Sequence, residues 1–273
     1  FLCMKNFTIS VKRYMKIMEN RRFFAYGCSY TEYPWPTWAD ILGRNYDKYY
    51  NYGRPGSGNM YMFNSIMETD QYHKLTKDDL VIVQWSSALR EDRYKDTNWV
   101  TMGGLYNIYS RREVKKFFDF RGFLIRDLAA IKAIKVFLDS IGCEYYFIGM
   151  VPLLQSIEYP DAQDVDISDI HRVYADVLKV IKPTYDEIIQ TAKTRPKLFY
   201  TRTISDTHPV PSEHYEYLEA VLPHLLKEPK SIAIDMDRKL AGIWKGDLNY
   251  SWEPEVWPDK IHSLFNDDKR IKL

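Results

Sequence analysis

Short apolar runs alternate with helical patterns along this chain of 273 residues. The runs lie at residues 23–27, 49–52, 80–85, 145–151 and 198–201. Segments with apolar residues at helical spacing separate or follow them, at residues 35–42, 59–67, 123–140, 170–181 and 212–226. Strands that alternate with helices are typical of a parallel sheet covered on both faces. We therefore predict an α/β fold with three layers and five parallel strands.

The segment 123–140 gives the clearest helical signal. Its apolar residues recur at steps of three and four, at Leu124, Leu128, Ile131, Ile134 and Leu138. Gly142 follows where a helix is expected to stop.

Length and composition fit one large domain with additions. Apolar residues make up 45% of the chain and charged residues 27%, which is ordinary for a globular protein. We predict an N-terminal extension at 1–20 and the α/β domain at 21–226. The polar, aromatic segment 90–121 reads as an insertion loop or lid. The segment 227–273 contains Trp244, Trp252 and Trp257 without clear periodicity, and reads as an extended arm that packs on the domain or on a partner.

Charge and cysteine content exclude several classes of partner. The net charge is +1, from 38 basic and 37 acidic residues, so we expect neither a nucleic-acid nor a membrane partner. No window approaches the roughly 18 apolar residues of a membrane span. The basic N-terminus lacks the apolar core of a signal peptide. Cys3, Cys28 and Cys143 have no CxxC spacing, and no metal spacing is present, so we expect no cofactor. The sequence leaves two locations open for the protein, the cytoplasm and a particle such as a virion.

Small and polar residues follow the predicted strands. Ser29 comes directly after the first, and the glycine-rich loop 51–59 (NYGRPGSGN) follows the second. Asp206-Thr207-His208-Pro209 precedes the last helix. The carboxyl ends of parallel strands share one edge of a sheet. A serine nucleophile needs a base, the base needs an orienting carboxylate, and the oxyanion needs preoriented donors. These segments together therefore indicate acyl transfer, although Asp206 to Pro209 alone would also fit a helix-capping turn.

The order Gly-x-Ser, Asn-x-Gly-x-x-Gly and Asp-x-His-Pro resembles the SGNH/GDSL hydrolase superfamily over residues 23–226. The resemblance implies a flavodoxin-like α/β/α fold and esterase, lipase or carbohydrate deacetylase activity. By that resemblance Ser29 is the nucleophile and its N–H the first oxyanion donor. Gly56 is the second donor, His208 the base and Asp206 its partner.

Three features depart from the family pattern. Cys28 replaces the acid that usually precedes the nucleophile. Trp85-Ser86-Ser87-Ala88 stands where the family has a third block with an asparagine oxyanion donor. Ser86 or Ser87 could donate instead, or could be a plain strand-end residue bonding the neighbouring loop. Asp206 stands two residues before His208 rather than three. The pattern from His208 to His214 is similar to divergent branches, including virus-encoded ones.

The remaining candidates have simpler roles. We expect Cys28 to be a small buried residue beside the nucleophile, and His214 to lie near the catalytic residues. Arg90, Trp85 and Asn59 are candidate substrate contacts.

Two functions stay open. The first is a serine esterase that removes small acyl groups, such as acetyl, from carbohydrate, because aromatic residues reach 15% of the chain and stack on sugars. The second is an interaction protein with a degenerate site, attached through the Trp-rich arm to an assembly such as a virion.

Overall fold

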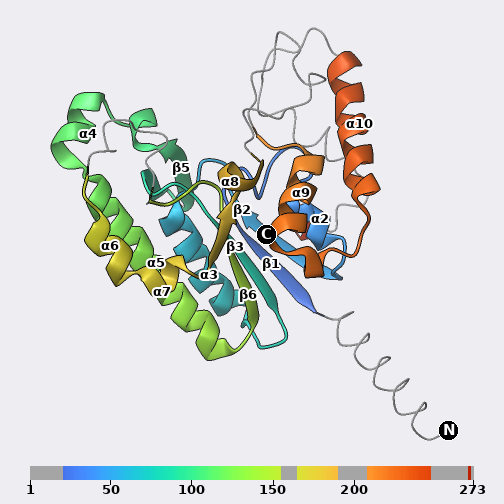
Figure 1. Cartoon of the computed structure of the whole chain (residues 1–273), viewed down its shortest axis with the longest axis horizontal. Coiled ribbons are helices and arrows are strands. Elements are labelled where there is room, and N and C mark those ends of the chain that lie inside the picture. The colour runs from blue at the N-terminus through green and yellow to red at the C-terminus, as the bar shows by residue number, and fades with distance from the viewer. Residues whose placement is uncertain (1–20, 155–164, 190–207, 247–269, 272–273) are drawn as a thin grey trace, which may run out of the picture.

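The structure, a computed structural model, describes residues 21–154, 165–189, 208–246 and 270–271 (Figure 1). One sheet has the strand order β7-β6-β3-β1-β2-β8, and all its printed pairings are parallel. Its strands are β1 (Arg22–Gly27), β2 (Lys48–Gly53), β3 (Leu80–Trp85), β6 (Glu144–Gly149), β7 (Ile181–Thr184) and the two-residue β8 (Arg270–Ile271). The predicted parallel sheet of five strands is confirmed, and β8 extends it beside β2.

The fifth strand differs from the prediction. The expected strand 198–201 lies outside the described residues, and β7 occupies the edge next to β6. The prediction of one helix over 170–181 was wrong. The segment holds α6 (Ser168–Val173) and α7 (Ala175–Leu178), and its last residue begins β7. Pro183 fits the strand at the end of this segment, because proline disfavours a helical conformation at Lys182 directly before it and is tolerated in an edge strand.

Helices cover both faces of the sheet (Figure 1). On one side lie α3 (Asn59–His73), α5 (Phe120–Ile141), α6 and α7, and on the other α2 (Trp38–Gly43) and α9 (Pro211–Val221). Strand β1 shows why both faces are apolar: Phe24 and Tyr26 join the core under α3 and α5, while Phe23 and Ala25 join the core under α2 and α9. Successive side chains of a strand point to opposite faces.

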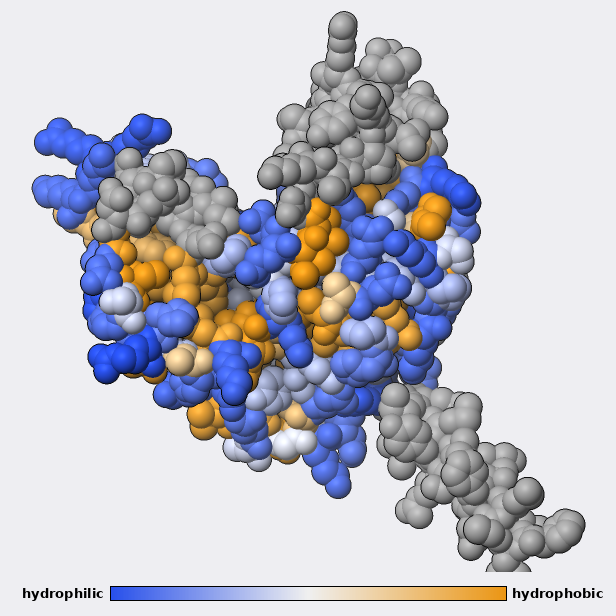
Figure 2. Space-filling view, viewed as in Figure 1, coloured by the Kyte–Doolittle hydropathy of each residue, from blue (hydrophilic) through white to orange (hydrophobic). Residues whose placement is uncertain are grey.

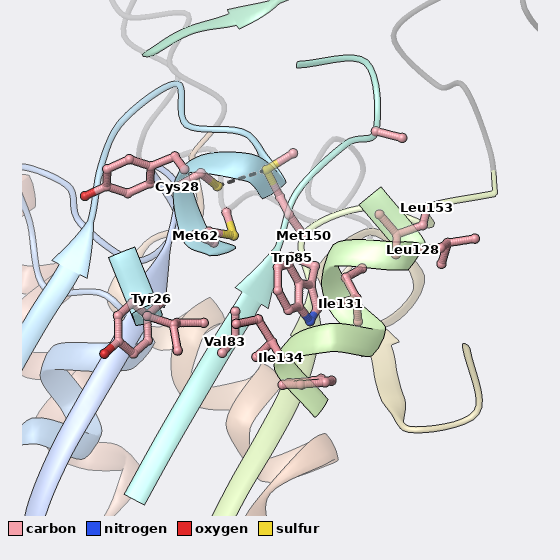
Figure 3. Packing of buried hydrophobic residues seen from close by; sticks show 14 of the residues in the cluster. Tyr26, Cys28, Met62, Val83, Trp85, Leu128, Ile131, Ile134, Met150 and Leu153 are labelled. Carbon is pink, nitrogen blue, oxygen red and sulfur yellow. Dashed lines mark hydrogen bonds between the residues drawn. The ribbon is translucent and has the colours of Figure 1, made fainter. Parts of the chain in front are cut away.

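The predicted helices at 35–42, 59–67, 123–140 and 212–226 are confirmed, with shifted ends. Helix α3 continues to His73, and the last segment breaks at Leu222 before the short 3-10 helix η4 (Pro223–Leu225). Helix α5 begins after Asp119, which accepts a hydrogen bond from Arg121 N, and ends before Gly142 at φ 73°. Figure 3 shows its buried side chains against the face of β3 that carries Val83 and Trp85.

The segment 90–121 is not an irregular loop. It forms an antiparallel hairpin of β4 (Arg90–Lys95) and β5 (Asn98–Gly104), then the 3-10 helix η1 (Leu105–Asn107) and α4 (Arg111–Phe117). Asp96 and Thr97 turn the hairpin with positive φ, which suits the turns that join two strands tightly. Asp92 anchors the hairpin, because its carboxylate accepts hydrogen bonds from Gly58 N and Tyr61 N at the start of α3.

The C-terminal segment corrects a second expectation. The predicted extended arm begins with α10 (Lys230–Gly246). Its residues Met236 and Leu240 pack against Tyr33 and Trp35. The side chains of the three arm tryptophans lie outside the described part of the chain, as does the N-terminal extension. Among the described helices, none is long and apolar enough to cross a membrane.

Gly149 gives a test of the packing between β6 and β7. A Cβ at this residue would lie 2.5 Å from Thr184 Cγ2, and Thr184 is held by a hydrogen bond from its Oγ1 to Glu187 Oε2. Gly149→Ala should therefore lower the free energy of unfolding by about 1–3 kcal/mol, measured by denaturant titration. Gly122→Ala is the matched control in α5. No neighbouring atom lies within 4 Å of its added Cβ, so it should stabilise by about 0.5–1 kcal/mol. Equal effects of the two substitutions would contradict this account.

Candidate active site

Ser29 lies in a tight turn at the carboxyl end of β1. Thr31 N and Glu32 N both donate to Cys28 O, at 2.9 and 3.1 Å. Thr31 Oγ1 then donates to Gln84 Oε1 of the neighbouring strand β3, at 2.8 Å. A Cβ at Gly27 would lie 2.0 Å from Thr31 Oγ1, so only glycine lets the chain fold back this closely.

The loop after β2 is tied to the same turn. Arg54 N and Ser57 Oγ both donate to Gly27 O, at 3.0 and 2.9 Å. Gly56 has φ +77°, and a Cβ there would lie 2.7 Å from Thr101 O. Its carbonyl accepts from Gly103 N at 2.8 Å. The loop is therefore held between β1 and the hairpin with Gly56 at the contact.

One pocket of about 1320 Å³ collects four of the predicted site residues: Ser29, Gly56, Arg90 and His208. Another wall comes from the insertion, where β5, η1 and the start of α4 contribute lining residues that include Met102, Tyr106, Tyr109 and Arg111. Figure 2 shows the surface hollowed between the part that holds α4 and α5 and the part that holds α9 and α10. The insertion is thus a structured wall of the pocket.

Aromatic side chains hold His208. Its ring stacks on Tyr33 with centroids 3.9 Å apart, and Tyr30 meets it edge-on at 5.6 Å. Trp35 Nε1 donates to Pro209 O at 2.8 Å. These three aromatic residues are not among the predicted site residues, although their density directly after Ser29 in the sequence indicates an aromatic cluster there. Asp206 lies outside the described residues, so its pairing with His208 stays a prediction.

His214 lies behind this aromatic group and is almost fully buried. Its Nδ1 is 2.7 Å from Tyr185 Oη, and Tyr30 meets its ring edge-on. Burial, and to a smaller extent the charge of His208, lowers the pKa of His214 to about 3. Burial also raises the pKa of Tyr185, so the Tyr185 hydroxyl keeps its proton and forms a hydrogen bond with the neutral imidazole. His214 therefore lies near the candidate catalytic residues, as expected, and its ring contacts Tyr30, which also contacts His208.

The end of β3 does not reach the pocket. Trp85 is fully buried in the core (Figure 3), and its ring packs edge-on against Phe147. Asn59 is also fully buried, and its Nδ2 donates to Ser86 O and to Asp127 Oδ2. These contacts correct the expectation that Trp85 and Asn59 contact substrate, because both side chains point into the protein.

Of the two roles expected for Ser86, oxyanion donor or strand-end residue that bonds the neighbouring loop, the structure shows the second. It is fully buried, its N–H donates to Asn59 Oδ1, and its Oγ donates to Ser57 O at 3.1 Å. Ser87 Oγ lies 3.5 Å from Leu89 N. Neither serine is among the described residues that line the pocket. Ser86 is thus a strand-end residue that binds the neighbouring loop.

Cys28 and Arg90 fit their expected places. Cys28 is fully buried with its Sγ 3.3 Å from Met150 Sδ (Figure 3). Arg90 is 8% exposed and lines the pocket. Of the three expected substrate contacts, only Arg90 reaches the pocket. Among the residues that the structure describes, no cluster of His, Cys, Asp or Glu could hold a metal ion.

The buried His214 predicts a pH-dependent stability. The folded state holds its pKa at about 3, against an ordinary 6.5, so below about pH 6.5 the unfolded chain takes up a proton that the folded protein does not. The free energy of unfolding should therefore fall as pH decreases, by about 2 kcal/mol between pH 7 and pH 5 from this group. His214→Asn, whose amide can still form a hydrogen bond with the Tyr185 hydroxyl, should remove that part, as measured by denaturant titration at both pH values.

His171→Asn, an exposed substitution on α6, controls for the loss of a histidine as such and should keep the wild-type difference. An unchanged pH dependence in His214→Asn would show that burial of His214 does not govern acid stability.

Comparisons with known proteins find similarity only among solved structures. No family model matches the chain, and no curated protein matches it. A member of the lipolytic G-D-S-L family from Veillonella parvula is 16% identical with a TM-score of 0.40, over 73% of this chain and 97% of the other. A GDSL-like lipase from Bacteroides thetaiotaomicron is 14% identical with a TM-score of 0.42, over 78% of this chain and 89% of the other. Both printed names contain the GDSL designation, and the likeness to virus-encoded branches stays a prediction. At these TM-scores neither match carries an argument, and the candidate function rests on the pocket itself.

Proposed function

We propose that this protein is a serine ester hydrolase with Ser29 as nucleophile and His208 as base. One observation carries the proposal: Ser29, Gly56 and His208 come from three separate segments of the chain, and all three line one pocket. These are the residue types that acyl transfer requires, at the edge of the sheet where the carboxyl ends of β1 and β2 meet.

The reaction follows from these roles. Ser29 Oγ attacks the ester carbonyl while His208 accepts its proton, and the backbone N–H groups of Ser29 and Gly56 stabilise the oxyanion. His208 then gives the proton to the leaving alcohol. Water attacks the acyl-enzyme, again with His208 as base, and the acid leaves as Ser29 regains its proton. Asp206, two residues before His208 in the sequence, would orient the imidazole.

Small acyl groups on carbohydrate are the substrates that we propose. The pocket is larger than an acyl group alone needs, and the tyrosines Tyr106 and Tyr109 line its wall. Aromatic rings present an apolar face with a polar edge, which suits the faces of a sugar ring. A buried nucleophile beside an open aromatic wall supports a small acyl group on a larger alcohol.

A serine-reactive fluorophosphonate and 4-nitrophenyl acetate test the proposal together. The wild-type protein should be labelled at Ser29 and hydrolyse the ester. Ser29→Ala and His208→Asn should each lower kcat/KM by at least about 10³-fold, because members of such a triad act as a unit. Both variants should melt near the wild-type temperature. Cys28→Ala is the control and should keep both labelling and turnover.

Absence of labelling in folded wild-type protein would contradict the proposal and favour an interaction protein with a degenerate site. Activity that survives in Ser29→Ala and is lost in Cys28→Ala would instead assign the thiol as nucleophile.

Asp206 has its own test. Asp206→Asn should lower kcat by about 10²–10⁴-fold, since the amide favours the wrong tautomer of His208. The steady-state rate on 4-nitrophenyl acetate measures this. A wild-type rate would show that another group orients the base.

A further inference from the structure

We propose that the guanidinium of Arg90 is the third donor to the oxyanion. This inference rests on the proposed esterase activity. The end of strand β3 does not supply the donor, because Ser86 Oγ donates to Ser57 O and neither Ser86 nor Ser87 is among the described residues that line the pocket. Arg90, which begins β4 shortly after β3, is the next residue of this segment that lines the pocket.

The contacts of Arg90 link it to the two segments that carry the proposed backbone donors, Gly56 N and Ser29 N. Its Nη1 donates to Ser57 O at 3.1 Å, and Ser57 follows Gly56 in the chain. Its Nη2 lies 3.7 Å from Met150 Sδ, the sulfur that Cys28 Sγ also contacts at 3.3 Å. Cys28 directly precedes Ser29. The guanidinium therefore contacts the neighbour of Gly56 directly and is linked to the neighbour of Ser29 through Met150 Sδ.

The burial of Arg90 strengthens the interaction of its positive charge with a nearby oxyanion. Arg90 is 8% exposed, and it lines the pocket, so the little surface that it keeps includes the pocket wall. A charge shielded from water interacts more strongly with a nearby oxyanion than an exposed charge does. The carboxylate of Asp92 is close enough for Arg90 to lower its pKa, although burial raises that pKa overall. Asp92 already accepts hydrogen bonds from Gly58 N and Tyr61 N, so it balances charge while it caps α3.

The backbone of Arg90 is fixed in place. Its carbonyl accepts from Arg126 Nη2 at 3.2 Å. On its other side, a Cβ at Gly58 would lie 2.8 Å from Arg90 Cβ, so the start of α3 touches the base of the side chain. A donor that is held before the reaction needs no reorganisation when charge develops.

The chemistry predicts a particular kinetic effect. The ester oxygen becomes negative only when Ser29 attacks, so a cationic donor at that oxygen favours the transition state over bound substrate. Hydrogen bonds from a charged donor are stronger than those from a neutral one. Loss of Arg90 should therefore lower kcat and leave KM nearly unchanged.

Arg90→Met and Arg112→Met are the matched pair. Both remove one positive charge from segment 90–121, but Arg112 is exposed on α4 and is not among the described residues of the pocket. On 4-nitrophenyl acetate, Arg90→Met should lower kcat by about 10²–10³-fold, the typical cost of one oxyanion donor, with KM within about threefold of wild type. Labelling of Ser29 by the fluorophosphonate should slow in parallel, because that reaction also places negative charge on an oxygen. Arg112→Met should match wild type in both assays.

Arg90→Lys keeps the test valid if Arg90→Met does not fold. Lysine keeps the charge but lacks the planar fork that can hold Ser57 O with one arm and the oxyanion with the other. Its kcat should fall by about tenfold while its melting temperature stays near that of wild type. A wild-type kcat in this variant would overturn the inference.

The two proposals fail in different ways. Suppose that wild-type protein is labelled at Ser29, and that Arg90→Met keeps kcat within about threefold of wild type, whether or not its KM rises. The inference about Arg90 is then overturned and the esterase proposal stands. If folded wild-type protein is neither labelled nor active, both proposals are overturned.

Discussion

The carbonyl oxygen of Gly27 joins the parts on which the pocket depends. It accepts hydrogen bonds from Arg54 N and from Ser57 Oγ, so the end of β1 and the loop after β2 become one unit. The same unit carries Ser29 on one side and Gly56 on the other. Because Gly56 O in turn accepts from Gly103 N in the hairpin, the insertion is fixed to that unit as well. Nucleophile, donor loop and pocket wall are thereby linked by backbone contacts that involve few side chains.

Sequence could predict this edge of the sheet because the signals there are local. An apolar strand followed by Gly and Ser, or by a glycine-rich loop, places the polar group at the strand end whatever the rest of the chain does. The burial of Trp85 could also have been predicted from the sequence. Val81, Val83 and Trp85 alternate along β3 and therefore share the face that packs under α5. The burial of Asn59 could not be predicted from the sequence, because its partner Asp127 comes from a helix far along the chain. The place of Arg90 at this edge could be predicted, but its burial could not, because its partners Ser57 and Met150 are distant in sequence.

The errors in secondary structure have a similar cause. Helix α10 was missed because its buried residues Met236 and Leu240 stand among charged neighbours, and the apolar partners that make the pattern meaningful, Tyr33 and Trp35, belong to the loop after β1. Tertiary contacts rather than local propensity decide such a helix. This contact also has a consequence for the site. Tyr33 stacks on His208 on one side and belongs to the α10 cluster on the other, so a helix outside the sheet supports the ring of the proposed base.

The burial of Arg90 bears on the choice between an enzyme and an interaction protein. Removing a guanidinium from water costs several kcal/mol before any partner compensates. Its described partners include a carbonyl oxygen, a thioether sulfur and the carboxylate of Asp92. Replacing a buried charged group and its partners by apolar residues of similar volume is often neutral or stabilising, so attachment alone gives no reason for a cation at this place. An oxyanion that forms beside Ser29 gives the buried charge a use that attachment does not, and this supports the reading of the pocket as a site of chemistry.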